Sequence, residues 1–328
     1  MSRSIILLGA AAIAVTAAWT GGWFWAKGEV EARMDTVLAD LAGRGTPLTC
    51  PQRTVSGWPF RIEIGCTAPT ATLADGSRVA AERLVVATVI DDWRLAVATI
   101  GGPVTVEAAD GTTARLTFAS LRASVRHDGR EPERISAAAE DLVASADAGG
   151  VVTTLAAKTG EVHLRRAEGA DRLDLAASLS SAEATSAGLA LLPVPADLSM
   201  VASLDEASRL SGRGPGELAD WQAAGGTATL TDFALALGES RLTGSGAVRL
   251  DAGGRPEGDV RITARDIETR ARLVASGKPV AAPLAALAGA FAIFGERTED
   301  GGRAVTLTAA GGRVSANGLA LGELDPLF

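Results

Sequence analysis

The chain opens with a continuous apolar stretch at residues 5–25, and Arg3 is the one charged side chain that precedes it. About 20 apolar residues span a bilayer as an α-helix. The positive-inside rule keeps the end that carries Arg3 in the cytoplasm. We therefore expect residues 1–26 to form a transmembrane anchor with aromatic side chains at its non-cytoplasmic interface. These aromatic residues are Trp19, Trp23, Phe24 and Trp25.

A cleavable signal peptide is the alternative interpretation of this stretch. The Ala-Ile-Ala run at 12–14 and the small residues at 16–18 offer candidate cleavage sites. The apolar character continues through the tryptophans, beyond the point where a signal peptide turns polar, and this favours a retained anchor. Either interpretation exports the rest of the chain. We expect a single-pass protein of the bacterial inner membrane, with its N-terminus in the cytoplasm and its body in the periplasm.

The apolar pattern changes to a helical stripe at residues 27–46. Its apolar members recur at intervals of three and four, and they are Val30, Met34, Val37, Leu38 and Leu41. Charged residues fill the other positions, and glycines at 43 and 45 end the pattern. The stripe predicts an amphipathic juxtamembrane helix that packs on the body, because it is too short for a stable coiled coil.

Beyond residue 47 the dominant pattern has a period of two, as in residues 241–251, where Leu242 and Leu250 alternate with Arg241 and Arg249. Alternation of this kind is typical of a half-buried antiparallel sheet. Asp-Gly pairs at 75–76, 110–111 and 128–129 interrupt such runs, and they are typical of tight hairpins. The sequence predicts a mainly β fold, a long antiparallel meander that forms a curved or partly closed sheet with a few short helices.

Two breaks divide this body. A proline-bearing connection and short helical patterns follow residue 189, so we expect an N-terminal β region at 47–188 and a C-terminal β region at 189–328, unless the two form one continuous domain. The second break is residues 279–294, which are apolar on nearly all sides. This segment is too short to span a membrane, and we expect a buried or groove-covering helix.

The charge of the chain limits the classes of partner it can bind, and its cysteine content indicates the compartment of the body. The net charge of −8 and a pI of about 5.0 argue against binding to nucleic acid, which needs clustered basic residues. The two cysteines, Cys50 and Cys66, lie close together in the sequence of an exported body. We expect them to form a disulfide rather than two buried thiols.

The sequence carries none of the common catalytic motifs. The chain lacks Gly-x-Ser-x-Gly, phosphate-loop and His-Glu-x-x-His motifs. His127 lies next to a predicted turn and His163 in a charged strand, so we expect both to face solvent. The acidic pair at 91–92 is typical of a solvated turn. The sequence therefore predicts no enzyme, no metal site and no cofactor.

Two segments carry a resemblance to a known family. One is Val-Ser-Gly-Trp-Pro-Phe-Arg at residues 55–61, which runs on to Cys66; the other is a glycine-rich block at 244–265 together with the chain end at 317–328. With the anchor, they resemble the domain-of-unknown-function family 2125 of alphaproteobacterial envelope proteins. The glycine-rich block is also distantly similar to the C-terminal hairpins of AsmA-like proteins, which implies a role in lipid transport or envelope biogenesis. Neither resemblance implies catalytic residues.

These features together predict an envelope protein that binds or handles lipid or another hydrophobic ligand. Its partners would be the inner membrane, lipid or other envelope proteins. The alternative is a structural or interaction protein with a fully packed sheet and no ligand. Trp58 and Phe60 share a strand parity with Ile62 and Ile64, which favours burial in the core over a ligand groove. The candidate contacts to a hydrophobic ligand are Trp58, Phe60, Leu284, Leu287 and Phe291.

Overall fold

The computed structural model of the protein describes residues 3–89, 91–129, 131–192, 194–210, 216–266, 291, 293–299 and 301–328. The chain divides into two compact units. The N-terminal unit comprises Met1–Glu131 and Ala146–Gly150, and the C-terminal unit comprises Pro132–Ser145 and Val151–Phe328. This division falls well before the boundary that local sequence composition suggests at residue 189.

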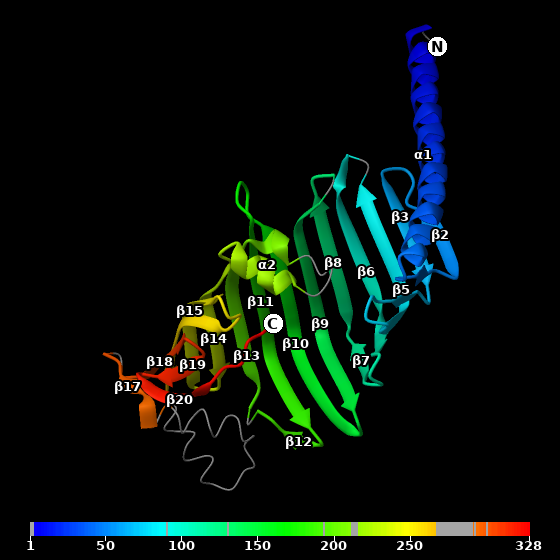
Figure 1. Ribbon diagram of the computed structural model, residues 1–328. Helices are drawn as coiled ribbons and strands as arrows, with labels where there is room; N and C mark the ends of the chain where they lie inside the picture. The colour runs from blue at the N-terminus through cyan, green and yellow to red at the C-terminus, as the bar shows by residue number, and fades with distance from the viewer. Residues whose placement is uncertain are drawn as a thin grey trace. The chain divides into compact units, whose positions relative to one another are not determined.

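A single long helix, α1 (Arg3–Gly43, 41 residues), begins the N-terminal unit (Figure 1). It joins the expected anchor and the expected juxtamembrane helix without a break, at about 1.5 Å per residue. Within the described part of the chain, its segment Ile6–Gly43 is the helix long and apolar enough to cross a membrane. Most of its apolar side chains are exposed, as at Ile13. An exposed apolar helix at this place is compatible with a membrane anchor or a signal sequence.

The N-terminal unit places short and long strands next to this helix. The strands are β1 (Leu48–Thr49), β2 (Gln52–Ser56), β3 (Arg61–Thr67), β4 (Thr70–Thr72), β5 (Arg78–Val89), β6 (Asp92–Glu107), β7 (Thr113–Thr117) and β8 (Ser120–His127). Antiparallel ladders join them in the order β2–β3–β5–β6–β8. Shorter ladders add β4 beside β5, β1 beside β4, and β7 beside β6.

The C-terminal unit is a longer meander (Figure 1). Its strands are β9 (Pro132–Ala148), which runs into the N-terminal unit at its last residues, β10 (Val151–Arg166), β11 (Arg172–Ser186), β12 (Leu189–Ala190), β13 (Ala196–Asp205), β14 (Thr227–Leu237), β15 (Ser240–Leu250), β16 (Pro256–Arg265), β17 (Glu296–Arg297), β18 (Arg303–Ala310), β19 (Arg313–Ala316) and β20 (Leu319–Glu323). Among these described strands, antiparallel pairing runs β9–β10–β11–β13–β14–β15–β16–β18–β19–β20. The 3-10 helix η1 (Ala207–Arg209) and helix α2 (Glu217–Ala223) lie in the β13–β14 connection.

The strand pattern confirms the mainly β, antiparallel fold with a long N-terminal helix and few other helices. In β15, Leu242 and Leu250 are buried while Arg241 and Arg249 are exposed, as the alternation of the sequence predicts. The Asp-Gly pairs lie in hairpin turns, and Gly76 and Gly111 take a positive φ of 86°. That backbone conformation is the reason glycine occupies the second position of these pairs.

The core of the C-terminal unit forms around its last strands, and its buried residues are Leu242, Ala264, Phe291, Val305 and Ala316. Phe291 is only 1% exposed. Asn317 links the residues before β17 to β18. Its Nδ2 donates to the carbonyl oxygen of Phe294 (2.6 Å), and its Oδ1 accepts the N–H of Thr306 (2.8 Å). The helix expected at 279–294 lies outside the described residues except for Phe291, Ile293 and Phe294.

Candidate functional site

An apolar groove of about 580 Å³ lies between α1 and the neighbouring strands of the N-terminal unit. The helix contributes one face, because its lining residues recur at intervals of three and four. The sheet contributes residues of β3, β5 and β6. The lining residues are Val15, Ala18, Trp19, Gly22, Trp23 and Ala26 from the helix, and Ile62, Thr88, Val89 and Trp93 from the strands.

Two tryptophans hold the helix against the sheet at this groove. Nε1 of Trp19 donates a hydrogen bond to the carbonyl oxygen of Pro59 (2.9 Å), and Nε1 of Trp23 donates one to that of Arg61 (3.0 Å). Trp23 is only 5% exposed, and the ring of Trp19 lies 6.2 Å from that of Phe60. The indole groups therefore combine apolar contact with backbone hydrogen bonds between segments 38 and 40 residues apart.

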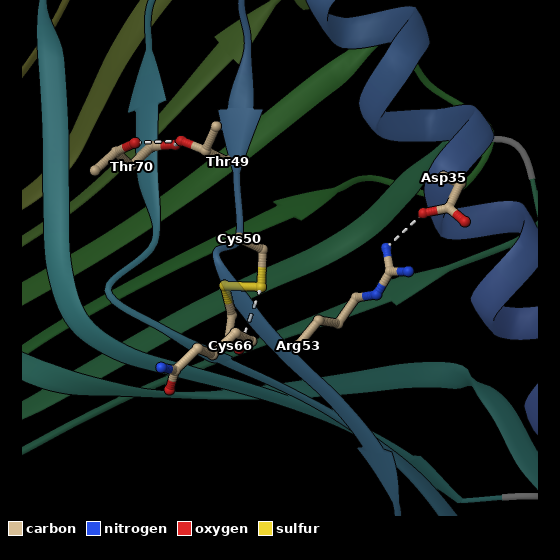
Figure 2. The surroundings of a disulfide bond; sticks show 7 residues. Asp35, Thr49, Cys50, Arg53, Cys66 and Thr70 are labelled. Atoms are coloured by element: carbon tan, nitrogen blue, oxygen red, sulfur yellow. Dashed lines mark hydrogen bonds and ion pairs between the residues drawn. A yellow bond between two sulfur atoms is a disulfide. The ribbon is translucent and has the colours of Figure 1, made fainter.

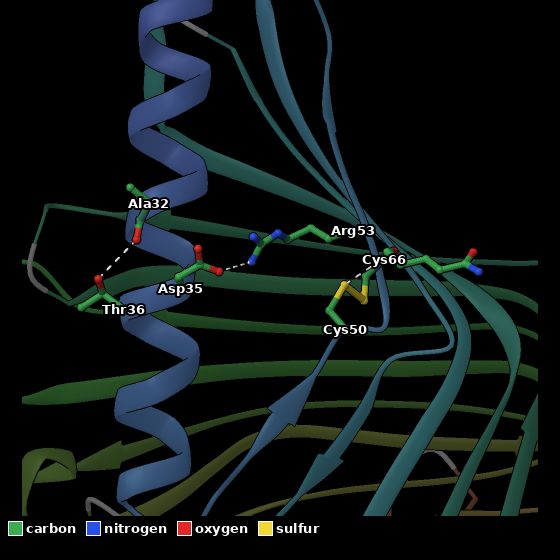
Figure 3. A network of polar contacts seen from close by, with 7 residues as sticks. Ala32, Asp35, Thr36, Cys50, Arg53 and Cys66 are labelled. Atoms are coloured by element: carbon green, nitrogen blue, oxygen red, sulfur yellow. Dashed lines mark hydrogen bonds and ion pairs between the residues drawn. A yellow bond between two sulfur atoms is a disulfide. The ribbon is translucent and has the colours of Figure 1, made fainter.

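A second attachment lies farther along α1. Nη1 of Arg53, on β2, donates to Oδ1 of Asp35 at 2.7 Å (Figure 3). The Asp35 carboxylate is largely exposed, so this ion pair contributes little stability by itself. Together with the tryptophans it attaches the helix to the sheet at two levels.

The groove has an apolar interior because its polar side-chain groups have partners. Both indole N–H groups donate to backbone carbonyls, and Oγ1 of Thr88 donates to the carbonyl oxygen of Asp92 (3.4 Å). No charged side chain is among the described lining residues. Such a surface favours an apolar occupant over a charged or sugar-like one.

A disulfide joins Cys50 and Cys66, whose Cα atoms lie 5.5 Å apart (Figure 2). This confirms the expected pairing. The bond connects the segment after α1 to β3, and beside it Oγ1 of Thr49 donates to the carbonyl oxygen of Thr70 (3.1 Å). The disulfide therefore restrains the base of the β2–β3 hairpin, whose turn reaches the groove at Pro59.

The structure contradicts the expected burial of Trp58 and Phe60, which are 53% and 70% exposed. The strand parity that they share with Ile62 does not apply, because residues 58–60 form the turn between β2 and β3. The Phe60 ring lies near Trp19 at the helix. Both residues thus sit at a hairpin tip beside the groove rather than in a core.

The other predicted ligand contacts do not lie at this groove. Leu284 and Leu287 lie outside the described residues, and Phe291 is buried in the core of the C-terminal unit. The groove instead uses Ile62, Val89 and Trp93, which the sequence did not single out as contacts. The sequence signal for Trp93 was its place directly after the acidic pair at 91–92, since a large apolar side chain next to a solvated turn can be exposed.

The expected interfacial aromatics divide into two pairs. Trp19 and Trp23 turn toward the sheet and line the groove. Phe24 and Trp25 are 60% and 73% exposed, and the ring of Phe24 packs edge-on to Trp23 at 5.2 Å. The same turn of helix therefore presents aromatic rings both to the protein and to its surroundings.

The histidines make local contacts. Nδ1 of His127 accepts the N–H of Gly129 (3.0 Å), which caps a turn. Nδ1 of His163 lies 3.0 Å from Oγ of Ser136, and its Nε2 lies 3.3 Å from the Glu161 carboxylate. His163 is exposed in an open hollow of about 570 Å³ with a mixed polar and apolar lining in the C-terminal unit. In the described part of the chain, no group of three or more His, Cys, Asp and Glu residues is placed to hold a metal ion.

Comparison with known proteins identifies the family of the chain. No curated protein and no solved structure matches the chain significantly. The similarity to AsmA-like proteins therefore stays a prediction. A family model described as "uncharacterized protein conserved in bacteria" (DUF2125) matches residues 23–325. The match covers nearly the whole body and the end of α1, and the chain belongs to this family.

Proposed function

We propose that the protein is anchored in the bacterial inner membrane by α1 and binds the acyl chain of a lipid in the groove between α1 and the sheet of its N-terminal unit. The observation that carries this proposal is the apolar, uncharged lining of a groove of about 580 Å³. One wall of that groove is the candidate membrane-spanning helix itself. An acyl chain is the ligand class that suits both properties.

The driving force would be burial of apolar surface. Relative to a lipid in water, each methylene group in the groove contributes about 0.8 kcal/mol without any specific polar contact. Relative to a lipid in the leaflet, van der Waals packing against the groove walls favours binding. The flat aromatic walls of Trp19 and Trp93 and the missing side chain of Gly22 suit an unbranched hydrocarbon. The role is binding without catalysis, in an envelope protein whose body lies in the periplasm.

The test uses the full chain, because α1 forms one wall of the groove. The protein is reconstituted into lipid nanodiscs that contain a phospholipid with a photoreactive diazirine in its acyl chain. Irradiation and peptide mass spectrometry then map the adducts. We expect adducts at Ile62 and Thr88, the two half-buried strand residues that line the groove.

A matched pair of glycine variants locates the binding. A Cβ at either Gly21 or Gly22 would meet nothing within 4 Å, but only Gly22 lines the groove. Gly22→Leu fills the groove and should remove the strand adducts, whereas Gly21→Leu should keep them. Strand adducts that survive Gly22→Leu, or their absence from the wild-type protein, would contradict the proposal.

A second role, recruitment of an envelope protein, is favoured by one observation. Among the described strands, β20 pairs with β19 alone, and all five of its residues are exposed, including Leu319 and Leu321. An open apolar edge can accept a strand from a partner. Leu321→Lys should then reduce cross-linking to that partner in cell envelopes, while the control Leu189→Lys should leave it unchanged. Equal cross-linking in both variants would exclude this use of β20.

A further inference from the structure

Four exposed apolar side chains gather at two hairpin tips of the N-terminal unit. The β2–β3 turn carries Trp58 (53% exposed) and Phe60 (70%), and the tip of the β5–β6 hairpin carries Val89 (41%) and Trp93 (57%). Exposed aromatic residues at loop tips are costly in water and are typical of surfaces that meet a partner or a membrane. Their position along α1 decides between these two partners.

The hydrogen bonds to α1 set the depth of the β2–β3 tip. Trp19 donates to the carbonyl oxygen of Pro59, and its ring lies 6.2 Å from that of Phe60 at a tilt of 49°, so the tip lies level with Trp19 along the helix. Trp19 precedes Trp25, the end of the apolar stretch, by six residues. At 1.5 Å per residue this is about 9 Å toward the membrane centre from that end. A spanning α1 therefore carries the tip below the headgroups, among the outer parts of the acyl chains.

We propose that the turn formed by residues 58–60 and the side chain of Trp93 insert into the non-cytoplasmic leaflet, so that the N-terminal unit docks on the phospholipid bilayer by its hairpin tips. This inference rests on the anchor of the proposed function but not on lipid binding in the groove. The surface that the apolar tips contact is the lipid bilayer itself. Insertion is favourable because the ring of Phe60 is apolar and the amphipathic indoles of Trp58 and Trp93 suit the interface.

The charges around the tips limit the depth of insertion. The exposed Asp91 in the β5–β6 turn must stay at the level of the headgroups. The carboxylate of Asp92 is paired with the Arg126 guanidinium (2.9 Å), and Arg61 is paired with Glu63 (3.0 Å). The guanidinium carbon of Arg94 lies 5.8 Å from the Trp93 ring centroid. Paired charges tolerate the interface far better than the hydrocarbon core, so only the aromatic ends reach the acyl chains.

Docking at this depth has a consequence for the groove. Val89 and Trp93 belong both to the β5–β6 tip and to the groove lining. An acyl chain could thus pass sideways from the leaflet into the groove without crossing water. The full desolvation cost of a free lipid would be avoided along that path.

The test is photocross-linking from the tip of the full chain in proteoliposomes of phosphatidylethanolamine and phosphatidylglycerol. Phe60→p-benzoylphenylalanine places the reactive group at the tip. Ile13→p-benzoylphenylalanine, on the exposed surface of α1, gives the lipid-facing reference. Leu73→p-benzoylphenylalanine is the matched water-facing control, because Leu73 is 46% exposed in the turn before β5. The twelve residues of β5 separate that turn from Val89 by roughly 36 Å.

We expect lipid adducts from positions 60 and 13, with the yield at position 60 at least fivefold above that at position 73. Equal yields at 60 and 73 would overturn the inference, and so would adducts at position 13 alone. The absence of adducts at position 13 would overturn both the docking and the anchor. A different result would refute the docking while leaving the proposed function intact: the groove adducts respond to Gly22→Leu, but the tip labels no lipid.

Discussion

The indole Nε1 of Trp23, on α1, donates a hydrogen bond to the backbone carbonyl oxygen of Arg61, on β3, at 3.0 Å. The indole is almost fully buried, so the bond lies in a region that excludes water. A carbonyl that loses its partner in such a place keeps the cost of its desolvation, which is about 1–3 kcal/mol. This contact is the innermost attachment between the helix and the sheet.

Trp23→Phe should therefore loosen the β2–β3 hairpin from α1 by about 1–2 kcal/mol. The measurement is hydrogen–deuterium exchange of peptides that cover β2 and β3, in the full chain in nanodiscs. We expect these amides to exchange several-fold faster than in the wild-type protein. Trp25→Phe is the control, because Trp25 is 73% exposed and should change exchange little. Identical exchange in the two variants would show that the hydrogen bond does not hold the hairpin.

The Cys50–Cys66 disulfide should stabilise the N-terminal unit by about 3 kcal/mol, as expected for a loop with a sequence separation of 16. The double variant Cys50→Ala/Cys66→Ala should unfold at a lower denaturant concentration than the oxidised wild-type protein. Reduced wild-type protein should match the variant, and this comparison separates the loss of the bond from the loss of two sulfur atoms. A reduced protein as stable as the oxidised one would contradict the prediction.

Local sequence patterns predicted the elements well because those elements depend on local physics. The apolar stretch and the stripe at Val30 and Leu41 predicted the helix that extends to Gly43. The alternation around Leu242 and Leu250 predicted both the strand and its buried face. In each case the period of the side chains matches the period of the backbone, and no distant contact is needed to fix it.

The groove could not be predicted in the same way. Its walls come from α1, β3, β5 and β6, and the contacts that position them join Trp19 to Pro59 and Trp23 to Arg61 across about 40 residues. No local period encodes such a contact. The error at Phe60 has a related cause, because strand parity was extended through a turn that reverses the chain. The unit boundary likewise follows long-range strand pairing rather than the composition change at residue 189.

Gly226 lies where a larger residue does not fit, since an added Cβ would overlap the indole ring of Trp221. That ring cannot move freely, because it is 5% exposed and its Nε1 donates to the carbonyl oxygen of Asp205 (2.7 Å). Gly226→Ala should therefore destabilise the C-terminal unit by about 1–3 kcal/mol. Urea unfolding followed by tryptophan fluorescence measures the change.

Gly322→Ala provides the matched control for that measurement. Gly322 lies on the exposed strand β20, and a Cβ there would meet nothing within 4 Å. The control should unfold within about 0.5 kcal/mol of the wild-type protein. Equal unfolding midpoints for the two variants would show that Trp221 can be displaced without cost.

The carboxylate of Asp174 links stability to pH in the C-terminal unit. It accepts hydrogen bonds from Nη2 of Arg165 (2.7 Å) and Nε of Arg172 (3.0 Å). The bond from Arg165, together with the two positive charges, holds the pKa of Asp174 below its ordinary value of 3.8. Because the folded state binds the proton more weakly than the unfolded state, this contribution is present above pH 4 and is lost as the pH falls through the lowered pKa.

Asp174→Asn should consequently lower the unfolding free energy at pH 7 by about 0.5 kcal/mol, the size usual for an exposed ion pair. The difference from the wild-type protein should shrink as the pH falls below 4, because protonation removes the same charge from Asp174. Urea unfolding of the full chain between pH 3 and pH 7 measures both effects. High salt should reduce the difference at pH 7, since it screens the two arginines. A difference that stays constant across this pH range would mean that the carboxylate charge does not contribute, and that the loss in the variant comes from altered packing.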